Sequence, residues 1–201
     1  MVADTDQADD VYDGGGGSDT YDASAGRADA VIDLLSGRAR SDDLGEDEIE
    51  DIENAVGGGG NDILIANDRV NVLSGGGGED VFVFRSSSTT GSGKDNRDKI
   101  LDFETGDRID LDDLGKEFAS GIVDAFEDQV IRKFVLINEQ SEFTKPGQLK
   151  FSYEEFNGET TTILHGNLDD DQAAEFELEL VGRHELHDDV FIRPHNWPHH
   201  V

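Results

Sequence analysis

The chain contains no cysteine and only 3 prolines among its 201 residues. A disulfide scaffold, a thiol nucleophile and a collagen-like repeat are therefore excluded. Positive charge is also scarce, because 16 Lys and Arg stand against 47 Asp and Glu and the formal net charge is −31. Such a charge argues against nucleic acid or an anionic membrane surface as a partner. No apolar run approaches the roughly 20 residues of a membrane span, and the first ten residues lack the basic and apolar regions of a classical signal peptide.

Catalytic signatures are missing as well. The sequence has no H-E-x-x-H zinc motif, no G-x-S-x-G motif and no P-loop. The sequence shows no motif that combines a nucleophile, a general base and a residue that orients the base, so we expect no enzyme activity. The six histidines are His165, His184, His187, His195, His199 and His200. Five of them gather near the C-terminus, which is compatible with a transition-metal site but more typical of a surface tail.

Glycine and phenylalanine are what the chain has in quantity, with 24 and 11 residues. That much phenylalanine is unusual for a disordered acidic tail. The excess negative charge nevertheless opposes a compact state. The composition therefore predicts an acidic chain that folds with the help of bound cations.

A nine-residue pattern, G-G-x-G-x-D-x-U-x with U a large apolar residue, recurs along the first half. It is complete at residues 14–22, 57–65 and 75–83 and degenerate at 5–13 and 66–74. The glycines permit a tight turn, and the x-U-x segment is a short strand with U facing inward. Two such units make one turn of a parallel β-roll, so residues 18 apart stack. We expect Tyr12, Tyr21, Leu64, Leu73 and Phe82 to fill its core.

The aspartate at the sixth position of each unit points to metal binding. Asp62 and Asp80 are 18 residues apart, so their carboxylates and the loop carbonyls would form the all-oxygen cage that Ca²⁺ prefers. A flexible glycine linker has no reason to repeat Asp at position six. We expect several Ca²⁺ ions. The candidate ligands in the repeats are Gly14, Gly15, Gly17, Asp19, Gly57, Gly58, Gly60, Asp62, Asn67, Asn71, Gly75, Gly76, Gly78 and Asp80.

The segment between the repeats is less regular. We expect a strand over residues 31–35 and another roll strand over 52–56. The acidic run 42–53 is expected to be a solvated insertion. The spacing across it is not a multiple of nine, so the sequence gives Asp19 no stacking partner.

The repeats resemble the RTX (hemolysin-type) family of calcium-binding β-roll proteins. Residues 97–111, RDKILDFETGDRIDL, resemble the segment that follows the roll in the C-terminal domain of serralysin-type secreted metalloproteases. Residues 147–153, 160–166 and 174–182 continue that resemblance, and the last two alternate like half-buried antiparallel strands. Residues 14–83 are also similar to the calcium-binding modules of mannuronan epimerases.

The resemblance implies an all-β chain with a parallel β-roll at 1–85, including an acidic insertion near 38–50, and an antiparallel β cap with a type I secretion region at 86–201. It also makes Asp98, Asp102 and Asp107 candidates for a further Ca²⁺ site where the roll meets the cap; solvated carboxylates beside a strand are the alternative. Asn167, Asp169 and Asp171 alternate like the start of an EF-hand loop. Gln172 and Leu178 stand where that loop needs Gly and Glu, so we favour an ordinary acidic hairpin loop.

The function that this resemblance implies is a secreted, non-enzymatic calcium-binding module at the cell surface or outside the cell. It would pass through a type I secretion apparatus and fold on meeting Ca²⁺ outside. One alternative is calcium-dependent binding of an alginate-like polysaccharide, which the charge of −31 disfavours unless Ca²⁺ bridges the two. Another is self-assembly into a surface layer or filament. Ile63, Ile65, Val81 and Val83 would face outward and need a cover, which we expect the C-terminal strands to provide.

Overall fold

The computed structural model describes residues 1–3, 5–87, 91–114 and 134–191. In these residues the regular structure is almost entirely β, with one 3₁₀ turn, η2 (Asp188–Val190). Within the same ranges no helix is both long and apolar enough to cross a bilayer. Ile192, His195, Trp197, His199 and His200 lie outside the described residues.

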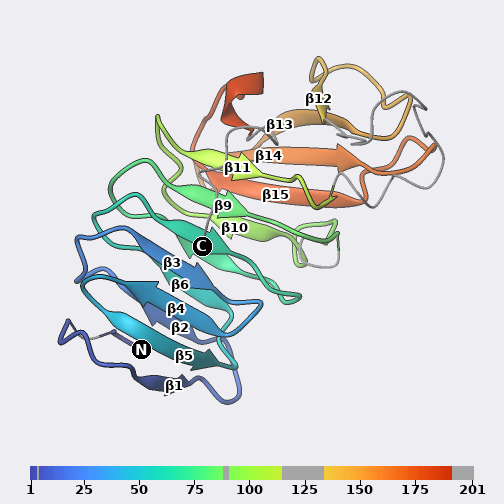
Figure 1. Ribbon diagram of the computed structural model, residues 1–201. Coiled ribbons are helices and arrows are strands. Elements are labelled where there is room, and N and C mark those ends of the chain that lie inside the picture. The colour runs from blue at the N-terminus through green and yellow to red at the C-terminus, as the bar shows by residue number, and fades with distance from the viewer. Residues whose placement is uncertain (4, 88–90, 115–133, 192–201) are drawn as a thin grey trace, which may run out of the picture.

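The strands form two sheets. In spatial order, the seven-stranded sheet contains β1 (Val11–Asp13), β5 (Gly45–Glu50), β4 (Arg38–Ser41), β3 (Ala30–Asp33), β7 (Ile63–Ile65), β9 (Val81–Val83) and β11 (Arg108–Asp110). The eight-stranded sheet contains β12 (Val135–Leu136), β13 (Gln148–Phe156), β14 (Glu159–Asn167), β15 (Phe176–Val181), β10 (Asp98–Ile100), β8 (Val72–Ser74), β6 (Asn54–Val56) and β2 (Thr20–Asp22). In Figure 1 the blue and green strands of the roll lie below the orange and red strands of the cap.

From β6 to β11 the chain passes alternately from one sheet to the other, and neighbours within each sheet run parallel. Leu64 is the partner of Phe82 in one sheet, and Ala55 is the partner of Leu73 in the other. This 18-residue register confirms the parallel β-roll. Tyr21, Leu64, Leu73 and Phe82 are fully buried and Tyr12 is partly buried against them. The predicted inward set is thus confirmed.

The acidic run is not the solvated insertion that we expected. Strand β4 pairs antiparallel with β3 and with β5 inside the seven-stranded sheet, and β5 also pairs parallel with β1. In β5, Asp47 and Ile49 are buried while Glu46, Glu48 and Glu50 are not. This period-two alternation makes a half-buried strand. Asp47 tolerates burial because its carboxylate accepts hydrogen bonds from the Tyr21 hydroxyl and the Asp10 amide.

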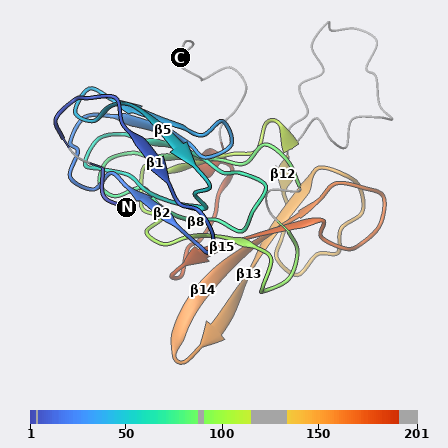
Figure 2. The same ribbon diagram turned by 90° about the horizontal axis from the view of Figure 1, so that it is seen from below.

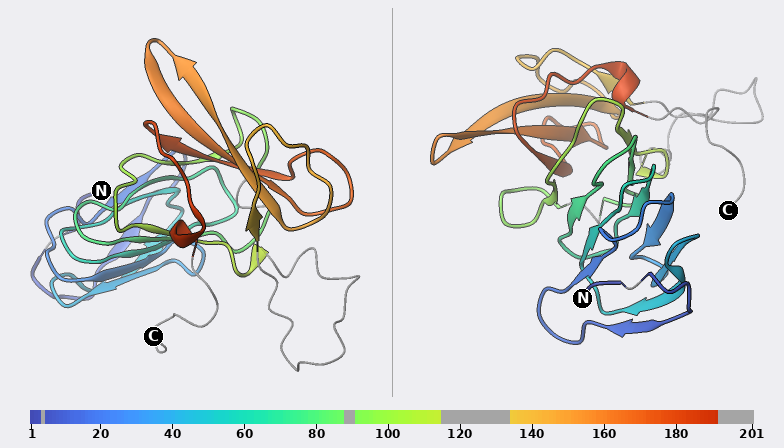
Figure 3. Two further views of the ribbon diagram at one scale, coloured as in Figure 1. Left: turned by 90° about the horizontal axis from the view of Figure 1, so that it is seen from above. Right: turned by 90° about the vertical axis from the view of Figure 1, so that its left-hand side faces the viewer.

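The cap is an antiparallel meander of β13, β14 and β15. It joins the roll directly, because β15 pairs parallel with β10, with Leu178 opposite Asp98. Figures 2 and 3 show the β13–β14 hairpin projecting away from the roll. Strands β10 and β11 follow residue 85 and still continue both sheets of the roll, so strand pairing does not break at that point.

The outward residues of β7 and β9 are covered in part. Ile65 and Val83 are buried, and Ile63 and Val81 are half-buried. We expected the C-terminal strands to provide this cover. Strands β13 to β15 instead belong to the other sheet, so they extend the eight-stranded sheet.

Candidate metal centre

Four loops lead from the eight-stranded sheet to the seven-stranded sheet, at residues 23–29, 57–62, 75–80 and 101–107. We call this side of the roll the first loop edge. Its aspartates form a ladder in which each carboxylate accepts an amide N–H from the turn before. Asp62 Oδ1 accepts from Ala30 at 2.7 Å, Asp80 Oδ1 from Asp62 at 2.8 Å, and Asp107 Oδ1 from Asp80 at 3.0 Å. Three sequence-predicted ligands therefore lie in one row.

The ladder buries negative charge. Asp62, Asp80 and Asp107 are 0%, 2% and 3% exposed, and burial raises the pKa of all three carboxyl groups. The pKa of Asp80 rises to about 6, first because of burial and then because the carboxylates of Asp107, Asp62 and Asp102 repel its charge. Among the described residues, none of the three aspartates has an ion-pair partner. A buried row of carboxylates without a cation is unfavourable.

The glycines bring carbonyl oxygens to the same edge. Gly76 (φ +94°) lies so close to the preceding loop that a Cβ would be 2.2 Å from the carbonyl oxygen of Gly58. A Cβ at Gly78 (φ +129°) would likewise be 2.1 Å from the carbonyl oxygen of Gly60. Carboxylates and carbonyls are hard oxygen donors, and Ca²⁺ takes six to eight of them. The donor set of the first loop edge therefore fits calcium.

Asp98, Asp102 and Asp107 do not form one site. Asp102 lies over loop 75–80, where Oδ1 accepts from the Gly75 amide, and Oδ2 accepts from the Gly76 amide and the Ser74 hydroxyl. Asp107 belongs to the ladder. Asp98 begins β10 on the opposite side of the roll and accepts the Asn71 N–H at 2.7 Å. Its Oδ2 is buried and has no hydrogen-bond partner in the described part of the chain, and burial raises the pKa of Asp98 to about 8.

The opposite side, the second loop edge, includes loops 14–19, 51–53 and 66–71 and the start of β10. Here the structure supplies the partner of Asp19 that the sequence left open, because the Asp19 N–H donates to the Glu53 carboxylate at 2.9 Å. Asn67 and Asn71 bond to each other, and their amide groups donate to the Ile52 and Glu53 carbonyls. Gly14, Gly15 and Gly17 lie on this edge too. The role of these residues as calcium ligands stays a prediction.

The second loop edge also contains a cation of its own, which our sequence analysis missed. The Arg69 guanidinium pairs with Asp51 at 3.0 Å and, more closely, with Glu53. The pKa of Arg69 is raised, first by the hydrogen bond to Glu53. Arg69 and Asp51 are 18 residues apart, so the register of the roll already aligns them. A charged side chain thus forms ion pairs with carboxylates on this edge, whereas among the described residues the aspartates of the ladder form none.

The cap brings together three residues that we did not expect to meet. Ser152 Oγ is 2.8 Å from His165 Nε2, and His165 Nδ1 is 2.9 Å from Glu177 Oε1. We expected that no nucleophile, base and base-orienting residue would come together. The positions of these three side chains show that this expectation is wrong, because each lies within hydrogen-bond distance of the next. Glu177 also faces Arg97 at 3.8 Å, and burial lowers the pKa of His165. The three residues lie on adjacent strands of the meander and connect β13, β14 and β15.

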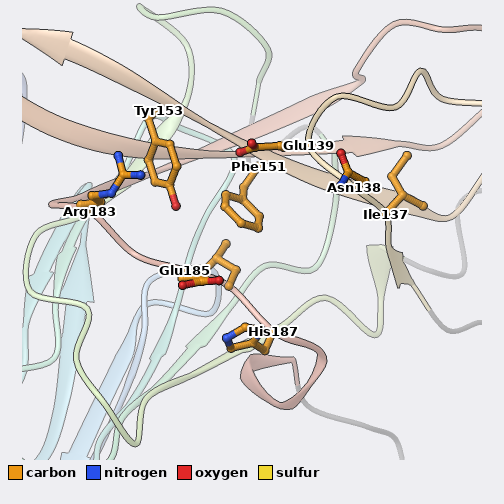
Figure 4. Close-up of a pocket in the computed structure, with 9 residues that line it drawn as sticks. Ile137, Asn138, Glu139, Phe151, Tyr153, Arg183, Glu185 and His187 are labelled. Atoms are coloured by element: carbon orange, nitrogen blue, oxygen red, sulfur yellow. The ribbon is translucent and has the colours of Figure 1, made fainter.

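A hollow of about 540 Å³ lies beside β13 and residues 183–187. Figure 4 shows Phe151 and Tyr153 on one side of it, with Arg183 stacked on Tyr153 and His187 opposite. The Arg183 guanidinium carbon is 3.9 Å from the centre of the Tyr153 ring. Phe151 and Tyr153 flank Ser152 along the strand, and alternate side chains leave opposite faces of a sheet. The hollow therefore offers Ser152 no binding pocket.

Comparison with known proteins agrees with this geometry. Among solved structures, the chain is similar to the AlgE6R3 subunit of the mannuronan C5-epimerase from Azotobacter vinelandii, with a TM-score of 0.51 and 22% identity over 94% of this chain and 87% of that one. The AlgE6R2 subunit of the same epimerase matches with a TM-score of 0.43 and 20% identity over 90% and 96% of the two chains. No curated protein matches the sequence. Residues 5–192 match the family described as Peptidase M10 serralysin C terminal. The chain therefore belongs to the serralysin C-terminal family and has the RTX β-roll that its repeats predicted.

Proposed function

We propose that this chain is a calcium-loaded RTX module in which the first loop edge binds several Ca²⁺ ions and in which binding and folding are coupled. One observation carries the proposal: the ladder of Asp62, Asp80 and Asp107 is buried and, among the described residues, its carboxylates form no ion pair with the protein; the nearby Arg108 guanidinium binds the Gly106 and Asp107 carbonyls instead. Bound calcium would supply the positive charge. The ladder exists only in the folded roll, so the free energy of binding adds to the free energy of folding.

Secretion and extracellular location are part of the proposal. Membership of a family named for a secreted protease's C-terminal domain supports them, as does the strongly acidic composition. A module that needs calcium would stay unfolded where calcium is scarce and fold where it is abundant. A type I secretion apparatus is the transport route that fits this behaviour.

Calcium-coupled folding is tested by circular dichroism of the full chain in excess EGTA and in millimolar Ca²⁺. We expect a cooperative gain of β signal with Ca²⁺ and little with Mg²⁺, which requires a smaller, nearly octahedral set of ligands. Asp80→Asn should weaken the calcium response at least tenfold. Glu79→Gln removes the same charge from an exposed neighbour in the same loop and should not. Equal β signal with and without calcium would disprove the proposal.

The proposal assigns no catalytic role to the chain, despite the alignment of Ser152, His165 and Glu177. The hollow lies on the other face of β13, and Glu177 is shared with Arg97, as an interstrand contact would be. A fluorophosphonate probe should therefore leave Ser152 unlabelled in the calcium-bound protein. Labelling that His165→Ala abolishes would contradict this assignment.

Calcium-dependent binding of a polysaccharide is a second candidate function. The hollow supports it, because the Phe151 and Tyr153 rings and the Arg183 guanidinium are groups that contact sugars and acidic sugars. Glu139 and Glu185 also line it and oppose an anionic ligand. Calorimetry with alginate oligomers in Ca²⁺ is the test, with Tyr153→Ala as the variant that should lose binding. Light scattering in the same buffer tests self-assembly.

A further inference from the structure

The turn between β14 and β15 gathers acidic side chains away from the roll. Asp169, Asp171 and Glu175 each offer a carboxylate oxygen, and these oxygens lie within 4.8 Å of one another. Among the described residues this is the one group of three such side chains that meets that limit. Burial and the charges of Asp169 and Asp171 raise the pKa of Glu175. The three carboxylates therefore repel one another as they stand.

A separate observation concerns Asn167, the last residue of β14. Its side chain is fully buried, and its Oδ1 has no hydrogen-bond partner among the residues that the structure describes. The amide nitrogen shows where the group points, because Nδ2 donates to the carbonyl oxygens of Asp171 at 2.8 Å and Ala173 at 3.0 Å. The side chain thus reaches into the acidic turn. A buried amide oxygen without a partner is unfavourable and needs an explanation.

The carboxylates are held in place and yet keep free oxygens. Asp169 Oδ1 accepts the Asp171 N–H at 2.8 Å, and Asp171 Oδ1 accepts the Ala173 N–H at 2.6 Å. Glu175 Oε2 accepts the Leu168 N–H at 2.5 Å. Asp169 and Asp171 each use one oxygen to accept a backbone N–H, and their second oxygens have no hydrogen-bond partner among the described residues. The Glu175 carboxylate accepts from the backbone N–H groups of Leu168 and of Glu175 itself. The turn therefore presents a fixed set of oxygens that lacks only a cation.

We propose that Asn167, Asp169, Asp171 and Glu175 form a calcium site in the cap, separate from the roll. All the donors are oxygens, which suits a hard cation, and the mixture of amide and carboxylate ligands on a turn suits the flexible coordination of Ca²⁺ better than the strict octahedron of Mg²⁺. The pattern lacks the glycine and the final glutamate of an EF-hand, so it is a shorter loop that closes on Glu175. All four ligands belong to the cap, but they meet only in the folded chain, so the site rests on the calcium-coupled folding proposed above.

Its position gives the site a structural role. Glu175 immediately precedes β15, and β15 pairs with both β14 and β10. A cation bound between Asn167 and Glu175 would fix the end of one strand to the start of the next. It would thereby hold β15 in the register that joins the cap to the roll.

The test compares two single variants of the full chain. Asp171→Asn removes a proposed ligand, whereas Asp170→Asn removes the same charge from an exposed residue of the same turn that lies outside the cluster. Bound calcium is counted by atomic absorption after equilibrium dialysis in millimolar Ca²⁺. We expect the Asp171→Asn protein to hold one ion fewer than the wild type, and the Asp170→Asn protein to hold the same number. An unchanged count in Asp171→Asn would overturn the site.

If the Asp171→Asn protein does not fold, nuclear magnetic resonance of the wild type provides a second test of the cap site. In protein that Ca²⁺ has already folded, the amide signals of residues 168–175 should shift further with a calcium dependence of their own, and the milder variant Glu175→Gln should weaken that further shift at least tenfold. Signals that stay still in the wild type refute the cap site. Asp80→Asn should abolish shifts in loops 57–62 and 75–80 while leaving those of 168–175, so failure of the roll proposal and failure of this one are distinguishable.

Discussion

Truncating the central side chain of the roll tests the register on which the fold and the calcium loops depend. Phe82 is fully buried, and its strand partners on the two sides are Leu64 and Ile109. The Phe103 ring lies 6.3 Å away, centre to centre. Backbone ladders on both sides of β9 hold these neighbours apart, so the space cannot readily collapse. Phe82→Ala should therefore lower the free energy of unfolding by about 3 to 5 kcal/mol.

The assay is urea denaturation in saturating Ca²⁺, followed by far-ultraviolet circular dichroism. Val70→Ala is the control, because Val70 is 44% exposed on the second loop edge and should change stability by less than about 0.5 kcal/mol. A higher calcium concentration should restore the free energy of unfolding of the Phe82→Ala protein only slightly, because the substitution creates a cavity in the core and leaves every proposed calcium ligand in place. A loss below about 1 kcal/mol for Phe82→Ala, or a loss equal to that of the control, would show that the register is wrong.

Three further predictions concern the two loop edges. Without metal, the folded state should gain stability as the pH falls from 7 to 5, because the raised pKa of Asp80, about 6, lets the folded state keep a proton that the unfolded chain releases. Circular dichroism of the metal-free protein should therefore show more β signal at pH 5 than at pH 7. In limiting calcium the β signal should fall instead, because protons displace the metal. Arg69→Gln removes the cation beside Glu53, so the folded chain should be less stable and more Ca²⁺ should be needed to reach half of the β signal; an unchanged midpoint would contradict the compensating role of Arg69. Gly76→Ala should cost at least about 1 to 3 kcal/mol, because φ is +94° and the Cβ would meet a carbonyl oxygen. At Gly77 an added Cβ would meet nothing within 4 Å, so Gly77→Ala should leave the melting temperature in saturating Ca²⁺ unchanged, whereas Gly76→Ala should lower it.

The repeats were predictable because their requirements are local. A tight turn needs glycine, and a short strand needs one inward apolar residue, so Leu64, Leu73 and Phe82 could be placed inside from spacing alone. Asp62 and Asp80 followed from the same 18-residue register. These features depend on nothing beyond one turn of the roll.

The features that were missed depend on the rest of the fold. Asp47 was read as solvated because its partners, Tyr21 and Asp10, are distant in sequence. Asp19 had no visible partner because strands β4 and β5 are inserted between the first repeats and Glu53. The contact of Ser152 with His165 comes from the register of β13 against β14, which alternation of apolar residues does not determine. Pairing across an insertion or a hairpin is not visible in composition or period.

The parallel pairing of β15 with β10 places one of the last strands of the described chain beside the roll rather than at a free end. Strand β10 lies between β8 and β15, so removing residues after 174 would convert it into an open edge with unpaired amide and carbonyl groups. Such an edge accepts any matching strand. The best match in solution is β15 of another molecule, and an exchange of that strand gives a swapped dimer. Truncated or slowly folding chains should thus associate through this edge, which β15 closes in the folded chain.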